Sequence, residues 1–146
     1  MAGEVVSLWI KRAHGRPMVP VPEIELVTGK GIRGNIDQGG WRHVTIIDEG
    51  AWGTAISELG IDVDPSARRA NVLVRGIDLY DTRGRVLKLG GTLIRIGGET
   101  RPCQLMDDAQ QGLRSALSPE WRAGAFGQIV EGGTLRIGDR VEWAVQ

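Results

Sequence analysis

Short apolar runs separated by glycine, proline or aspartate dominate the hydrophobic pattern of this chain. The run EIELVTG alternates apolar and polar positions, and EVVSLWIK is rich in β-branched residues. Short runs with turn residues at both ends are typical of the strands of a barrel or sandwich. The predicted strands are 4–11, 23–29, 42–48, 70–76, 84–90, 92–98, 127–133, 134–139 and 140–145.

Two segments have the period of a helix instead. In 49–60, apolar residues recur at helical spacing, and Gly60 follows as a stop signal. In 104–117, leucines and alanines recur in the same way until Ser118 and Pro119 end the pattern. The chain is therefore predicted to be mainly β, a β-barrel with about two helices.

Length and composition indicate one ordinary globular domain over residues 1–146. Eighteen basic and eighteen acidic residues cancel, so charge gives no reason to expect a nucleic-acid or membrane partner. No apolar run approaches the ~20 residues of a membrane helix, and the N-terminal segment lacks the features of a signal peptide. A single cysteine cannot form an intramolecular disulfide. We therefore expect a soluble, cytoplasmic protein.

That single cysteine, Cys103, follows Pro102 at the point where a predicted strand gives way to a predicted helix. Unpaired N–H groups at the start of a helix favour a thiolate, the form that binds metals and attacks electrophiles. Arg101 would add to this effect, whereas Asp107 and Asp108 one turn along would oppose it. The alternative is a cysteine that is simply a small buried hydrophobe.

A glycine-rich segment, GKGIRGNID, is a second candidate. Gly31 and Gly34 alternate with Lys30 and Arg33, so backbone N–H groups and two cations are placed to approach an anion. The segment is neither a P-loop nor a dinucleotide fingerprint, because the order of residues and the following helix are missing. The alternative is a wide surface turn.

Arginines before the strand 70–76 are a third candidate. Arg68 and Arg69 stand where a guanidinium can reach a phosphate, and Asn71 would share a face with Arg69 if the strand has begun by then. The alternative is a solvated strand edge. The two histidines and one cysteine do not form a zinc signature, and there is no GxSxG nucleophile motif.

The order of the segments VTGKGIRGN, RHVTIID, RRANVLVRGIDL, GGTLIRIGGETRPC and GAFGQIVEGGTLRIGD resembles the MOSC domain, named for the C-terminal domain of molybdenum cofactor sulfurase. The resemblance covers roughly 29–141 and implies a MOSC-type β-barrel. It places the family's Pro-Cys pair on Pro102 and Cys103, and its Arg-x-Asn motif on Arg69 and Asn71. The family's thiolate ligates the molybdenum of a pterin-based cofactor, or is proposed to carry sulfur as a persulfide.

The resemblance also implies which residues bind the cofactor: Lys30, Gly31, Arg33, Gly34, Arg69, Asn71 and Pro102, with Cys103 as metal ligand and catalytic residue. One departure is Asn35, where the family loop usually has an aspartate. The role of that carboxylate would then pass to Asp37 or be lost.

Three functions are consistent with these residues. The first is an oxidoreductase that reduces N-hydroxylated small molecules, with electrons from an external donor because the chain has no iron–sulfur cysteines or flavin motif. The second is a sulfur carrier that receives a persulfide on Cys103 from a cysteine desulfurase. The third is a non-catalytic binder of the cofactor. Pyridoxal phosphate is not expected, since the family's sulfurases bind it in a separate domain that this chain is too short to include.

Overall fold

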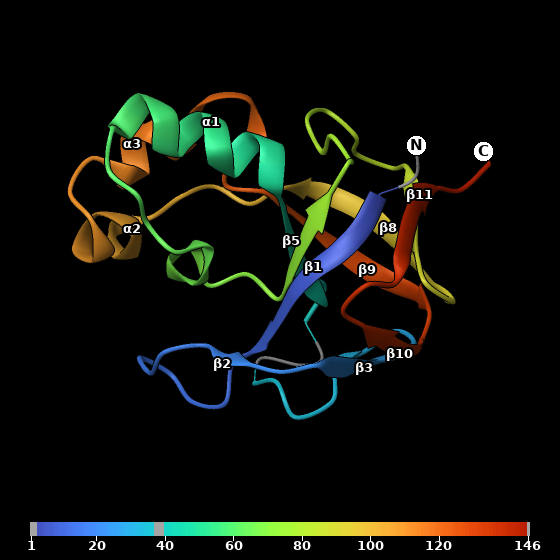
Figure 1. Cartoon of the computed structure of the whole chain (residues 1–146). Coiled ribbons are helices and arrows are strands. Elements are labelled where there is room, and N and C mark those ends of the chain that lie inside the picture. Colours follow the sequence, from blue (N-terminus) through green and yellow to red (C-terminus); the bar gives the residue numbers. More distant parts are fainter. Residues whose placement is uncertain (1–2, 37–39, 146) are drawn as a thin grey trace.

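Seven strands form a closed barrel in a computed structural model of the chain, which describes residues 3–36 and 40–145. Their order around the barrel is β11-β7-β8-β9-β5-β6-β1, and pairing of β1 with β11 closes it (Figure 1). Every pair is antiparallel except β5 and β6. The barrel strands are β1 (Gly3–Ile10), β5 (Val44–Asp48), β6 (Val72–Arg75), β7 (Val86–Leu89), β8 (Thr92–Glu99), β9 (Ala125–Glu131) and β11 (Arg140–Trp143).

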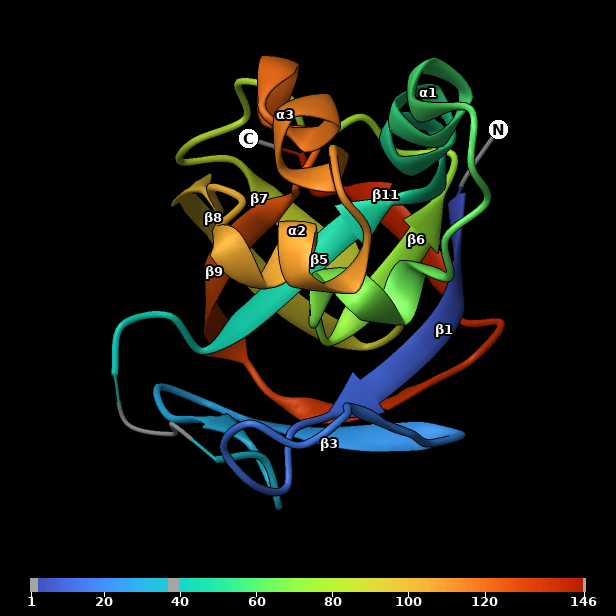
Figure 2. The same ribbon diagram turned by 90° about the vertical axis from the view of Figure 1, so that its left-hand side faces the viewer.

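A small sheet lies below the barrel in the view of Figure 1, and the helices cover another side, as Figure 2 shows. The small sheet has the order β10-β3-β4, and the short strand β2 pairs with β1. These strands are β2 (Val19–Pro20), β3 (Glu23–Val27), β4 (Gly31–Ile32) and β10 (Gly133–Arg136). All nine predicted strands are present, so the prediction of a mainly β barrel is confirmed.

The helices are α1 (Glu49–Leu59), α2 (Gln104–Ala109) and α3 (Leu113–Leu117), with 3-10 turns η1 (Pro65–Arg68) and η2 (Pro119–Trp121). Helix α1 begins and ends where the sequence predicts. Asp48 accepts a hydrogen bond from the Ala51 N–H at 2.7 Å, and Gly60 ends the helix at φ +76°. The single helix predicted for 104–117 is wrong: Gln110 is extended and Gly112 has φ +90°, which divides it into α2 and α3.

Two apolar clusters explain this arrangement. Alternate strand residues fill the barrel, among them Leu87, Leu89 and Ile94, none of which is exposed. A second cluster lies between the barrel wall and the helices, where Trp52 and Met106 are buried with α3 residues. The helices therefore bury one apolar face each against the outside of the barrel.

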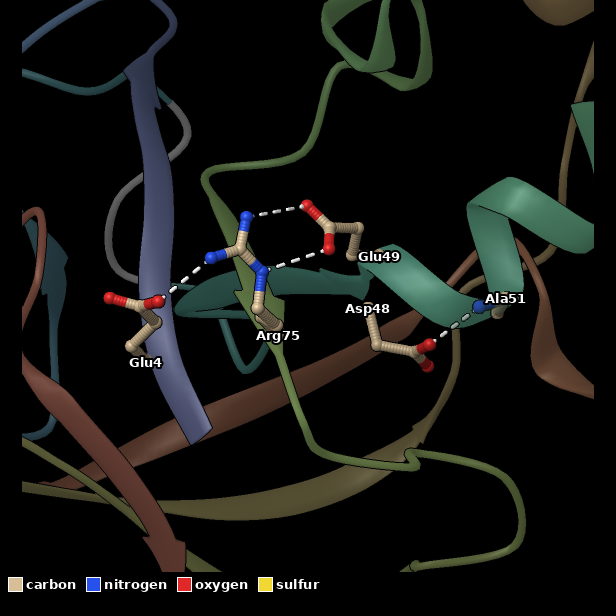
Figure 3. A network of polar contacts seen from close by, with 5 residues as sticks. All are labelled: Glu4, Asp48, Glu49, Ala51 and Arg75. Atoms are coloured by element: carbon tan, nitrogen blue, oxygen red, sulfur yellow. Dashed lines mark hydrogen bonds and ion pairs between the residues drawn. The ribbon is translucent and has the colours of Figure 1, made fainter. Parts of the chain in front are cut away.

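Arg75 on β6 joins β1 to the start of α1 (Figure 3). Its Nη1 lies 2.8 Å from Glu4 Oε1, and its Nε and Nη2 lie 2.9 and 3.2 Å from the two carboxylate oxygens of Glu49. All three side chains are about half exposed, so the network adds little stability. Its two-pronged geometry nevertheless fixes the orientation of the first turn of α1 relative to β6 and β1.

Candidate functional site

Cys103 stands at the junction between the barrel and the helical layer. It is the residue immediately before α2, and its carbonyl accepts a hydrogen bond from the Met106 N–H at 2.9 Å. The thiol is exposed and makes no capping hydrogen bond. The alternative that Cys103 is a buried hydrophobe is therefore wrong, and the thiol is accessible to a ligand.

Arg68 lies within electrostatic range of this cysteine. It ends η1, is only 7% exposed, and donates a hydrogen bond from Nε to the Ala123 carbonyl at 2.6 Å. Burial lowers the pKa of this guanidinium to about 10, the charge of Cys103 raises it, and the charge of Arg42 lowers it. The Cys103 thiol and the Arg42 guanidinium thus both lie within electrostatic range of Arg68.

Arg69 points elsewhere. Its backbone is left-handed at φ +64°, and its Nη1 donates to the Arg16 carbonyl at 2.8 Å. Strand β6 begins only at Val72, so the condition for a strand face shared by Arg69 and Asn71 is not met. The two side chains nevertheless line the same cavity.

Asn71 is a buried residue in the lining of that cavity. It is 6% exposed, and its Oδ1 accepts hydrogen bonds from the Thr45 N–H and hydroxyl, each at 3.1 Å. Its Nδ2 donates to the Trp9 carbonyl at 3.2 Å and to Asn35 Oδ1 at 3.3 Å. One amide therefore joins β1, β5 and the loop after β4, and buried polar groups satisfied in this way hold a site rigid.

The cavity has a volume of about 430 Å³, within the usual range for small-molecule sites. Its charged lining comes from Lys11, Arg42 and Arg69, and the described lining residues include no carboxylate. An adjoining cavity of about 260 Å³ shares Arg69 and is lined on its other side by Leu105, two residues after Cys103. The cationic lining favours an anionic ligand, and Cys103 itself lines neither of the two cavities.

The glycine-rich segment takes part only through its end. Asn35 and Ile36 line the cavity, whereas Lys30, Gly31, Arg33 and Gly34 do not. The Nε of Arg33 instead lies 2.6 Å from Glu25 Oε2, while Gly31 and Gly34 have φ +154° and +81°. Cofactor binding by these four residues stays a prediction.

Asn35 takes the place of the family's usual aspartate at this end of the segment. Its Oδ1 accepts from the Lys11 N–H at 2.6 Å and from Asn71, and its Nδ2 donates to the Ile36 carbonyl at 2.9 Å. Asp37, the other position considered for a carboxylate, lies outside the described residues.

Two further hollows lie away from Arg69. Pro102 lines one of about 380 Å³ beside Glu99 and Arg101. A larger cavity of about 550 Å³ has three carboxylates and one cation in its lining, and none of the predicted site residues. These charged residues are Asp48, Asp78, Glu120 and Arg122. Its carboxylates oppose an anion, so size alone does not make it the candidate site.

The residues present fit a pterin-based molybdenum cofactor. A thiolate is a soft ligand suited to a transition metal, and the cations of the cavity suit a phosphate tail. The described residues contain no cluster of three or more histidine, cysteine or acidic side chains, so a metal at Cys103 would need ligands from a cofactor. Thr100, three residues before Cys103, has a buried hydroxyl that lacks a partner among the described residues.

Sequence reasoning missed Arg68 as the neighbour of Cys103, and it missed Lys11, Trp41 and Arg42 as lining residues. Arg68 was recognised only as part of a basic pair before a strand. None of the four carries a local signal, because their roles depend on which segments the barrel brings together.

Comparisons with known proteins agree with this fold. YuaD from Bacillus subtilis superposes with a TM-score of 0.83 at 20% identity, over 100% of this chain and 98% of that one. YiiM from Geobacillus stearothermophilus gives 0.77 at 15% identity, over 98% and 75% of the two chains. YiiM from Escherichia coli gives 0.71 at 17% identity, over 100% and 71%.

A comparison with curated protein sequences finds no significant match. Every helix among the described residues is too short or too polar to cross a bilayer. The sequence profile of the MOSC domain matches residues 32–142, which is most of the chain. The protein therefore belongs to the MOSC domain family, a family associated with binding of the molybdenum cofactor.

Proposed function

We propose that this protein binds a pterin-based molybdenum cofactor and acts as an oxidoreductase on N-hydroxylated small molecules. The observation that carries the proposal is a cavity whose described charged lining is entirely cationic, together with the exposed Cys103 thiol two residues before Leu105 of the adjoining cavity. Cys103 would be the thiolate ligand of the metal. Arg69 and Arg42 would bind the anionic tail of the cofactor, and Asn71 would hold the cavity floor in place.

The proposed reaction is reduction of an N–O bond. The bond between nitrogen and the hydroxyl oxygen breaks, two electrons and two protons enter, and the products are an N–H group and water. When bound, the cofactor supplies the two-electron redox chemistry. The electrons come from an external protein donor. The proposed location of the protein is the cytoplasm, because a single cysteine is typical of a reducing compartment.

The test is the molybdenum content per chain, measured by elemental mass spectrometry. The protein would be purified anaerobically from a host that makes the cofactor, beside Cys103→Ser and the control Thr54→Ser on the exposed side of α1. We expect near-stoichiometric metal in the wild type and the control, and loss of metal in Cys103→Ser. Turnover of an N-hydroxylated compound with a reducing partner then separates an enzyme from a non-catalytic binder. No metal in any of the three proteins would contradict the proposal.

A second function is favoured by the same exposure of Cys103. As a sulfur carrier, its thiolate would attack the terminal sulfur of a persulfide on a cysteine desulfurase. A new S–S bond would form on Cys103, the donor S–S bond would break, and the donor would leave as a thiolate. This function predicts that the wild type gains the mass of one sulfur atom on incubation with a desulfurase and cysteine, and that Cys103→Ser does not.

A further inference from the structure

Trp41 is an exposed aromatic side chain in the wall of the cation-lined cavity. Its exposed fraction is 61%, whereas Trp9 and Trp52 are 6% and 5% exposed. A tryptophan in water leaves a large apolar surface unburied, which costs free energy unless a partner covers it. Its place in a cavity wall makes a ligand the natural cover.

The Trp41 ring packs against a buried aromatic neighbour. Trp41 packs edge-to-face on Phe126, with ring centroids 5.0 Å apart and planes at 76°. Phe126 is 3% exposed and lies so close to Gly97 that an added Cβ there would be 2.5 Å from the ring. A support of this kind orders the tryptophan before a ligand arrives, which lowers the cost of binding.

One cation lies near the same ring, and two more line the cavity. The guanidinium of Arg42 lies 4.6 Å from the centre of Phe126 and 6.0 Å from that of Trp41. Lys11 and Arg69 complete the cationic lining. The cavity therefore combines a flat aromatic surface with positive charge, which matches a planar ring that carries an anionic group.

We propose that Trp41 is the stacking platform for a fused nitrogen heteroaromatic ring bearing a phosphate. The inference rests on the proposed function in that the pterin of the cofactor is one ring of this class, and a purine-type substrate is another. Trp41 would stack on the ring while Arg42 and Arg69 bind the phosphate. Neither the Pro-Cys pair nor the Arg-x-Asn motif includes this residue.

Tyr80 provides a matched control. It is 50% exposed and also packs edge-to-face, on Trp121 with centroids 6.5 Å apart and planes at 83°. It lines the larger cavity, where Asp48, Asp78 and Glu120 supply negative charge. The two sites thus share the aromatic geometry and differ in the sign of the surrounding charge.

The experiment is isothermal titration calorimetry on cofactor-free protein from a host unable to make the pterin cofactor. The probes are a pterin monophosphate, adenosine monophosphate and inorganic phosphate, and the proteins are wild type, Trp41→Ala, Trp41→Phe and Tyr80→Ala. Loss of one stacked ring is expected to weaken binding of a ring-bearing probe about ten-fold or more in Trp41→Ala. Trp41→Phe should retain most of the affinity, and Tyr80→Ala should bind as the wild type does. Inorganic phosphate should bind equally to all four.

The two ring-bearing probes distinguish the source of the ring. Dependence on Trp41 for the pterin probe alone assigns the platform to the cofactor, and for the adenosine probe alone to a substrate; both results support the inference. Equal affinity of Trp41→Ala and wild type for both probes, or no binding of either, overturns it. The metal assay on Cys103 is independent: if no metal binds but Trp41-dependent ring binding remains, the proposed function fails and this inference stands.

Discussion

The buried guanidinium of Arg68 and the exposed thiol of Cys103 lie close enough for the charge of the sulfur to raise the pKa of the arginine. The arginine is held by the Ala123 carbonyl on the segment that leads into β9. That segment also pairs with the end of β8, since the Thr100 N–H donates to the Gly124 carbonyl at 2.9 Å. The cation is therefore positioned by the segment that leads into β9, which is itself paired with the end of β8.

Replacing this arginine should weaken the fold. Arg68→Met keeps the length of the side chain but leaves the Ala123 carbonyl without its donor, at a cost of about 1–3 kcal/mol. Arg101→Met is the control, because Arg101 is 88% exposed beside the same cysteine and its ion-pair distance to Glu99 is 3.9 Å. Urea unfolding should show a change within about 0.5 kcal/mol for the control. Equal losses in the two variants would contradict a structural role for Arg68.

Asn35 gives a prediction about the departure from the family pattern. In Asn35→Asp the carboxylate can still accept from the Lys11 and Asn71 N–H groups, but it can no longer donate to the Ile36 carbonyl. The lost hydrogen bond should lower the free energy of unfolding by roughly 0.5–1.5 kcal/mol. The added negative charge should also weaken binding of a pterin monophosphate in the cavity, as calorimetry would show.

The barrel was predictable because its signals are local. Each strand, such as Val86–Leu89, is a short apolar run with turn residues on both sides, and such a run forms a strand in the folded chain as well. The break between α2 and α3 was missed because the apolar residues on both sides continue a helical period across Gly112. A glycine permits a left-handed backbone but does not require it, so tertiary packing decides whether the helix ends there.

The site was predictable only in part. Arg69 and Asn71 were both named from the sequence, and they line one cavity although they share no strand face. The burial of Arg68 and the exposure of Trp41 were missed because neither property can be seen in a sequence. Both follow from contacts between segments far apart in the chain.

His43 should make stability depend on pH. Its Nδ1 accepts a hydrogen bond from the Ile129 N–H at 2.9 Å, and burial lowers its pKa below the ordinary 6.5. The unfolded chain therefore takes up this proton more readily than the folded one. The contribution is fully present above pH 6.5 and is lost as pH falls below it. His43→Asn keeps an acceptor without the titration, so urea unfolding on either side of pH 6.5 should show a smaller change than the wild type. An identical pH dependence would contradict this assignment.

Two glycines of the α1 segment should respond to alanine in opposite directions. Gly53 lies inside the helix with nothing within 4 Å of an added Cβ, so Gly53→Ala should stabilise the protein by about 0.5–1 kcal/mol. Gly60 also has open space, but its φ of +76° strains any other residue. Gly60→Ala should therefore destabilise by roughly 1–2 kcal/mol. Thermal unfolding of both variants measures the difference, and a shift of the same sign in both would show that the capping geometry is wrong.

Gly97 should be essential for the support beneath Trp41. An added Cβ would lie 2.5 Å from Phe126 Cε2, and because that ring is only 3% exposed it has little room to move. Gly97→Ala should therefore destabilise the protein by about 1–3 kcal/mol and also weaken binding of a pterin monophosphate through displacement of Trp41. Gly91→Ala, in the turn before β8 with nothing within 4 Å, is the control and should change neither quantity appreciably.

Gly97→Ala combined with Phe126→Leu should recover part of the stability, because the smaller side chain relieves the overlap, but not the affinity, because the aromatic support is gone. Recovery of both would show that Phe126 acts only as filler and does not orient the tryptophan.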